Sequence, residues 1–222
     1  MKPYVICYMM TSVDGRIDCA MTAQLKGVDN YYRVLDELDV PTTVSGHTTA
    51  KLEMALPGAF SPKNYEVLGR EAFARNSVAA GYEVVVDSKG TLLWEKGEQD
   101  GKPLLVITSI QVTNDYLSYL DSLGISWIAC GDTHADLAGA CQILAEHFGV
   151  RRLGVVGGPT LNTSFLEAGL LDEIAVLIGP GIDGRREMPS VFEGRKGAAP
   201  LPLSLLSVKA YEDGSVLLRY RV

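Results

Sequence analysis

The chain lacks several features that would assign it to a class of protein at once. No apolar run among its 222 residues reaches the roughly 18 that a membrane-spanning helix needs. The opening MKPYVICYMM has no small-residue cleavage site, so we do not expect a signal peptide. The chain has only three histidines, and its four cysteines form no C-x-x-C pair. We therefore expect no metal site and no membrane partner, and reduced, mostly buried thiols in a cytoplasmic protein.

Positive charge is also in short supply, because 27 acidic residues outnumber 20 Lys and Arg and leave a formal net charge of −7. A nucleic-acid partner is not expected, because the phosphate backbone binds to a basic face. A small phosphorylated ligand stays possible, since helix N-termini and a few local cations can hold it.

Short apolar runs and helical patterns alternate along the chain, which favours an α/β fold with a mainly parallel central sheet. The expected strands are 4–10, 42–46, 82–87, 103–108, 125–130, 152–158 and 173–180. The expected helices are 30–39, 49–56, 112–124, 133–149 and 159–169. The stretches 57–81 and 184–200, rich in Gly, Pro and polar residues, are expected to be loops.

The C-terminal segment LPLSLLSVKAYEDGSVLLRYRV predicts two strands joined at the turn signal Asp213-Gly214. The sheet should therefore end in an antiparallel hairpin. We found no internal repeat and no linker, so a single domain over 1–222 is expected.

The most informative turn is VVGGPTLN at 155–162. Gly157 and Gly158 end a strand and Pro159 opens a helix, so a phosphate could lie against the bare backbone and the helix N-terminus. A glycine turn chosen only for tight packing is the equally weighted alternative.

Three further turns follow expected strands. In SGHTTAKLE, Gly46 and His47 precede a helix, and in VVVDSKG, Ser88 and Lys89 lie just past a strand end, where open α/β sheets bind ligands. In MTSVDGRID, Asp14 is either a substrate-binding carboxylate or only a turn residue. Taken singly, each of these has a structural explanation that is at least as good.

Together the four turns, in this order and spacing, resemble the reductase family of riboflavin biosynthesis, which has the dihydrofolate-reductase-like three-layer fold. The resemblance runs from about residue 4 to 192. Its most specific part is GGPTLNTSFLEAGLLDEI. It implies NADPH-dependent hydride transfer to a C=N or C=O group of a ribosylaminopyrimidine 5′-phosphate, as in a 5-amino-6-(5-phosphoribosylamino)uracil reductase.

The resemblance also implies roles for particular residues. Asp14 is the expected catalytic residue, and Ser12, Asp14 and the position of Val156 are expected at the substrate. The expected cofactor contacts are Gly46, His47, Thr48, Thr49, Glu53, Ser88, Lys89, Gly157, Gly158, Pro159, Thr160, Leu161, Asn162 and Thr163.

The substrate half of the pattern departs from the family. Val156 stands where the family has a substrate-binding glutamate, and Glu37 stands near the place of an arginine that helps to hold the ribose phosphate. The charged loop residues Arg185, Arg186 and Arg195 could supply a cation instead, although such loops are more often simply solvated.

Two other classes stay open: a dihydrofolate-reductase-like enzyme with a different substrate, and a nucleotide-binding module without catalysis. The resemblance also implies a homodimer. The apolar C-terminal strands could form its surface, or they could be covered within the chain.

Overall fold

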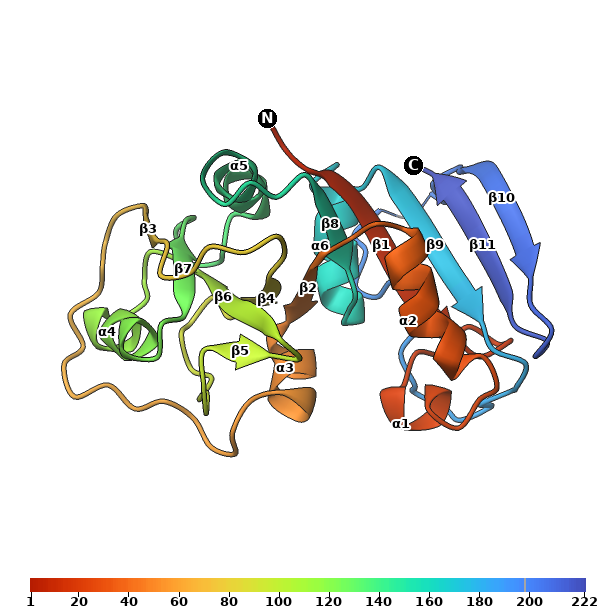
Figure 1. Ribbon diagram of the computed structural model, residues 1–222, viewed down its shortest axis with the longest axis horizontal. Helices are drawn as coiled ribbons and strands as arrows, with labels where there is room; N and C mark the ends of the chain where they lie inside the picture. Colours follow the sequence, from red (N-terminus) through yellow and green to blue (C-terminus); the bar gives the residue numbers. More distant parts are fainter. Residues whose placement is uncertain (198) are drawn as a thin grey trace. The chain divides into compact units, whose positions relative to one another are not determined.

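The computed structural model describes residues 1–197 and 199–222, and the chain forms two compact units (Figure 1). The first unit comprises Met1–Pro3 and Pro41–Leu153, and the second comprises Tyr4–Val40 and Gly154–Val222. Strand β8 (Arg152–Val155) begins in the first unit and ends in the second. The expectation of a single domain stays a prediction.

The first unit is built on parallel strands. Its elements are β2 (Thr42–Gly46), α3 (His47–Glu53), β3 (Ala72–Ala74), β4 (Glu83–Val86), β5 (Glu98–Gln99), β6 (Lys102–Thr108), α4 (Asn114–Ser122), β7 (Ser126–Ala129) and α5 (Leu137–His147). The strands lie in the order β2-β4-β6-β7-β3, parallel from β2 to β7. The short strands β3 and β5 pair antiparallel with β7 and β6.

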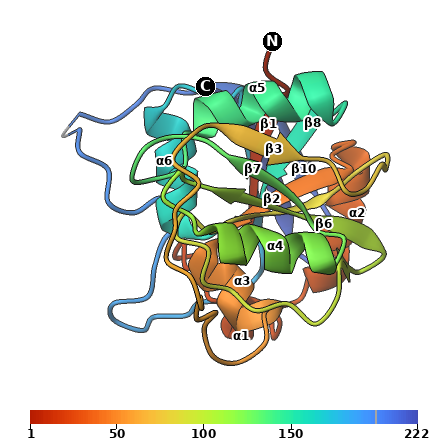
Figure 2. The same ribbon diagram turned by 90° about the vertical axis from the view of Figure 1, so that its left-hand side faces the viewer.

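Successive side chains along these strands point to opposite faces of the sheet, and each face carries an apolar layer. Val85, Val106 and Trp127 belong to one core cluster, together with Tyr116 and Leu120 of α4. Helices α4 and α5 lie on opposite sides of the strands (Figure 2). Buried positions three and four residues apart in α5 are typical of a helix that packs one face on a sheet.

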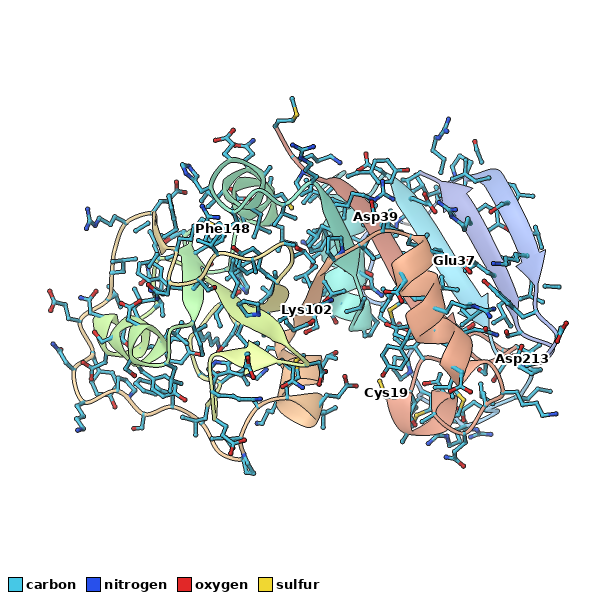
Figure 3. The ribbon with its side chains drawn as sticks, viewed as in Figure 1. Cys19, Glu37, Asp39, Lys102, Phe148 and Asp213 are labelled. Atoms are coloured by element: carbon cyan, nitrogen blue, oxygen red, sulfur yellow. The ribbon has the colours of Figure 1, made fainter. Side chains whose placement is uncertain are left out.

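The second unit carries the antiparallel edge. Its elements are β1 (Tyr4–Thr11), α1 (Cys19–Thr22), α2 (Val28–Glu37), α6 (Pro159–Glu167), β9 (Glu173–Ile178), β10 (Ser204–Ala210) and β11 (Val216–Arg221). The strands lie in the order β10-β11-β9-β1, with β1 and β9 parallel and the other two pairs antiparallel. Asp213 lies at the hairpin turn (Figure 3), as the Asp-Gly signal predicts.

Helix α2 covers one face of this second sheet. Tyr8, Leu177 and Leu217, from three different strands, belong to the cluster that contains Val34 of α2. These alternate strand positions point to one face, so their strand neighbours point to the other. The fold class is thus the predicted one: α/β, with parallel central strands and an antiparallel C-terminal hairpin.

Several helix ends follow their expected signals. Pro159 begins α6, and Gly149 and Gly169, just past α5 and α6, have positive φ angles of 71° and 64°. Four expected starts are wrong. Helices α2 and α3 each begin two residues early, at Val28 and His47, and α4 begins two residues late, at Asn114. Helix α5 begins at Leu137 rather than at 133, because Asp136 caps it through Ala138 N (3.0 Å).

The expected loops contain little regular structure. Within 57–81 the structure has only the three-residue strand β3, and the described residues of 184–200 contain no helix or strand. Cys7, Cys130 and Cys141 are buried thiols, as expected, whereas Cys19 is exposed at the start of α1 (Figure 3). Among the described residues, no helix is long and apolar enough to cross a membrane.

Glu83, at the start of β4, gives a pH prediction. Burial raises the pKa of its carboxyl to about 7, although Thr43 Oγ1 donates a hydrogen bond to it (2.5 Å). The folded state therefore keeps a proton that the unfolded state releases near pH 4.5, so stability falls as pH rises from about 4.5 to 7. Glu83→Gln should be more stable than the parent at pH 8, by up to about 3 kcal/mol, and similar at pH 4.

The measurement is urea unfolding at both pH values. Glu95→Gln is the control, because Glu95 is exposed. A Glu83→Gln variant with the parent's pH dependence would contradict the prediction.

Candidate functional site

The expected cofactor residues fall into two groups, one in each unit, and the expected substrate residues lie in the second unit. In the first unit, a cavity of about 300 Å³ opens beyond the ends of β2 and β4. The residues that line it are His47, Val86, Asp87, Ser88, Lys89 and Thr91. The structure thus brings together three of the expected cofactor residues.

Asp87 shapes this cavity, and the sequence analysis did not single it out. The buried carboxylate accepts hydrogen bonds from Thr91 N (2.6 Å) and Leu92 N (2.8 Å), which closes the turn between them. Gly90 in that turn has a φ of 65°, and an added Cβ would lie 2.5 Å from the Tyr116 ring. The Asp-Ser-Lys-Gly turn signal was the available clue, but its burial depends on α4.

Three polar side chains of the cavity can contact a ligand. Ser88 Oγ accepts a hydrogen bond from Ala135 N (3.1 Å), so its hydroxyl proton can still be donated. His47 Nε2 lies 3.1 Å from Thr91 Oγ1. The Lys89 side chain adds a positive charge from an exposed position.

The other expected residues of this unit do not line the cavity. Gly46 is the N-cap of α3 and makes no side-chain capping bond. Thr48 and Glu53 are exposed on α3, and Thr49 is half-buried. Their expected contacts with the cofactor stay predictions.

The glycine turn of the second unit leads into α6. Gly157 has a φ of 113°, a region that favours glycine, and an added Cβ would lie 3.3 Å from Met9 Cε. Gly158 is the N-cap and has no side chain that could cap the helix, so the first N–H groups of α6 receive no side-chain hydrogen bond from it. Val156 is half-buried before this turn.

Buried polar atoms without a partner lie on the first turns of α6. Asn162 is fully buried and Thr163 nearly so, yet Asn162 Oδ1 and Thr163 Oγ1 have no hydrogen-bond partner. Such atoms are costly unless something satisfies them. Asn162 Oδ1 can only accept a hydrogen bond, whereas Thr163 Oγ1 can donate or accept, so these atoms fit a polar ligand with donors of its own. Pro159 and Leu161 complete the turn, with Thr160 exposed beside them.

Two of the expected substrate residues, Ser12 and Asp14, lie in the loop after β1. Ser12 is buried, and its hydroxyl donates to Asp14 Oδ1 (2.7 Å). Asp14 also accepts the main-chain N–H groups of Asp183 (2.9 Å) and Gly184 (3.0 Å). These hydrogen bonds hold the pKa of the Asp14 carboxyl well below its usual range, so it is ionised at neutral pH.

The charged residues of the neighbouring loops are mostly engaged. The Arg185 guanidinium contacts the carboxylates of Asp18 and Asp183, and Arg195 donates to Ala199 O (2.8 Å). Glu37 pairs with Lys209 of β10 at 2.9 Å, a contact on the surface of the unit. The described residues contain no group of three or more His, Cys, Asp or Glu that could hold a metal ion.

Comparison with known proteins identifies the family. The model of the RibD C-terminal domain family matches residues 3–217, so the chain belongs to this family, and the predicted resemblance is confirmed.

Individual relatives agree with this assignment. A 2,5-diamino-6-ribosylamino-4(3H)-pyrimidinone 5′-phosphate reductase of Archaeoglobus fulgidus is 27% identical over 198 residues, which cover 87% of this chain and 88% of the relative. A solved pyrimidine reductase-like protein from Corynebacterium diphtheriae shares the fold, with a TM-score of 0.71, 17% identity, and coverage of 99% of this chain and 92% of that one. Acinetobacter baumannii RibD also shares the fold, with a TM-score of 0.67 and 20% identity. The match covers 99% of this chain and 58% of that one.

Proposed function

We propose that the protein is an NADPH-dependent reductase of the riboflavin pathway that acts on a ribosylaminopyrimidine 5′-phosphate. The family match over 3–217 carries the proposal. The reductase from Archaeoglobus fulgidus, of which the match covers 88%, supports the substrate class. The cofactor would supply a hydride from its nicotinamide ring to a C=N or C=O carbon of the substrate. A cytoplasmic location is part of the same proposal.

Residues of each unit fit such a cofactor. The first amides of α6, together with Asn162 and Thr163, offer the unsatisfied polar groups that a dinucleotide needs. Ser88, Lys89 and His47 offer a hydroxyl, a cation and an imidazole around one cavity, which suits a phosphate. In both units, the protein's part is to bind and orient; the hydride comes from the cofactor.

The first experiment supplies NADPH with three candidate substrates. These are 2,5-diamino-6-ribosylamino-4(3H)-pyrimidinone 5′-phosphate, its deaminated uracil counterpart and dihydrofolate. We expect NADPH oxidation with a ribosylaminopyrimidine and a product that has gained two hydrogens by mass spectrometry. Turnover of dihydrofolate alone would instead establish a folate reductase. NADPH binding without turnover of any of them would leave a nucleotide-binding module.

A second experiment tests the phosphate cavity. Lys89→Ala should weaken NADPH binding about tenfold, because a charge-assisted contact is lost, and should leave the weaker binding of NADH unchanged. Calorimetric titration with each nucleotide measures both. Lys63→Ala is the matched control, since Lys63 is an exposed lysine of the same unit outside the cavity. Equal losses for NADPH and NADH would refute a contact with the additional phosphate.

We also propose that the protein is a homodimer that pairs through β10. This strand ends the strand order, and all seven of its residues are exposed. Leu205 is 58% exposed and Val208 57%, on the sheet face opposite α2, because Val208 pairs with Leu218 while its neighbour Lys209 pairs with the core residue Leu217. Two copies of β10 can pair antiparallel about a twofold axis, which would satisfy the edge and cover these side chains.

Val208→Asp should convert the dimer to a monomer, because it places a charge in the proposed interface. Size-exclusion chromatography with light scattering measures the mass. Val78→Asp is the control, since Val78 is an exposed valine of the first unit. A monomeric parent protein, or a dimer that survives Val208→Asp, would rule out this interface.

A further inference from the structure

Asp14 joins two segments that lie far apart in the sequence. Its Oδ1 accepts from Ser12 Oγ and Asp183 N, and its Oδ2 accepts from Gly184 N. A carboxylate has about four lone-pair positions, and three of them are filled by donors from the protein. Little of this carboxylate is left for a substrate.

Asp183 and Gly184 belong to the segment 181–191, which we call the 181–191 loop. This loop is also hydrogen-bonded to the turn after β1 at other points. Val13 N donates to Gly181 O (2.8 Å) and Ile17 N donates to Pro189 O (3.2 Å). The Arg16 guanidinium donates to Met188 O. Asp183 and Gly184 lie between these contacts, and their N–H groups are held by the Asp14 carboxylate.

A third element reaches the far end of the same loop. Asn162 Nδ2, on α6, donates to Val191 O (2.8 Å). The loop therefore links the turn after β1 with the helix that follows the glycine turn, all within the second unit. A shift of the loop would disturb residues that the proposed function uses.

The loop also forms one wall of a cavity of about 320 Å³. Ile182, Asp183 and Arg185 line it on the loop side, and Asp18, Met21 and Gln24 line it on the side of α1. Arg185 bridges the two walls through Asp183 and Asp18. The position of Asp183, and with it the ion pair, depends on the N–H groups that Asp14 accepts.

We infer that Asp14 is a positioning residue, whose carboxylate holds the 181–191 loop in place and so sets the substrate side of the second unit, and that it is not the proton donor of the reaction. The functional half of this inference rests on the proposed reductase function. The positional half rests only on the hydrogen bonds and can be tested without any ligand.

Amide hydrogen exchange in the unliganded protein tests the positional half. In Asp14→Asn one carboxylate oxygen becomes an NH₂ group, which cannot accept, so one of the two loop amides loses its acceptor. At least one of the amides of Asp183 and Gly184 should then exchange at least tenfold faster. Unchanged exchange at both would overturn the inference.

The chain offers a matched control in the other unit. Asp115 Oδ2 accepts the successive amides of Lys63 (2.7 Å) and Asn64 (2.8 Å) from a loop about fifty residues away in the sequence. Because one oxygen accepts both amides, Asp115→Ala is the variant that removes their acceptor, and it should speed exchange at 63 and 64 only, with unchanged turnover. If Asp14→Asn does not fold, Ser12→Ala removes one of the three donors and should speed the same Asp183 and Gly184 amides by a smaller factor; unchanged rates again overturn the inference.

Steady-state kinetics test the functional half. Asp14→Asn should raise KM for the pyrimidine substrate about tenfold, lower kcat less than tenfold, and keep the parent's pH profile in shape. Loss of one limb of that profile, with kcat reduced a hundredfold or more, would make Asp14 the acid and overturn the inference. A parent protein with no reductase activity would refute the proposed function, whereas the exchange result would still decide the role of Asp14.

Discussion

The hydrogen bond from a loop N–H to an aspartate carboxylate is the interaction on which the candidate residues of each unit depend. Asp87 accepts two such bonds in the turn after β4, and Asp14 accepts two in the loops after β1 and β9. Turns after parallel strands leave main-chain amides without ladder partners, and buried amides must find one. Here a carboxylate satisfies them and at the same time fixes the backbone that presents Ser88, Lys89 and the 181–191 loop.

The start of α6 differs from these turns because it carries buried side-chain atoms without a partner. Its N-cap is a glycine, and Asn162 Oδ1 and Thr163 Oγ1 have no hydrogen-bond partner. Such atoms cost stability unless a bound group satisfies them. The contrast between satisfied loop amides and unsatisfied side-chain atoms separates the residues that support the backbone from those proposed to bind the cofactor.

The departures from the family pattern acquire a physical meaning in the second unit. Glu37, near the place of a family arginine, pairs with Lys209 of the hairpin, and Val156 puts an apolar group before the glycine turn. Neither residue can hold a phosphate. If the protein binds a ribosylaminopyrimidine phosphate as proposed, its phosphate contacts differ from those implied by the resemblance, and Arg185 would have to leave an aspartate to provide one.

The sequence by itself determined the fold class, most strands and the C-terminal hairpin, because apolar periodicity, Pro159, Gly169 and Asp213-Gly214 act locally. The family followed from the resemblance of four turns to a known pattern. Helix starts were less predictable, since Asp132, Thr133 and Asp136 can all cap a helix and only the path of the chain after Gly131 selects Asp136. Only the tertiary structure decided the role of Asp14, because its partners Asp183 and Gly184 lie about 170 residues away and their N–H groups leave no mark in the sequence. The same holds for Asp87: a turn residue by its sequence, it becomes the support of a cavity because folding buries it beneath Tyr116.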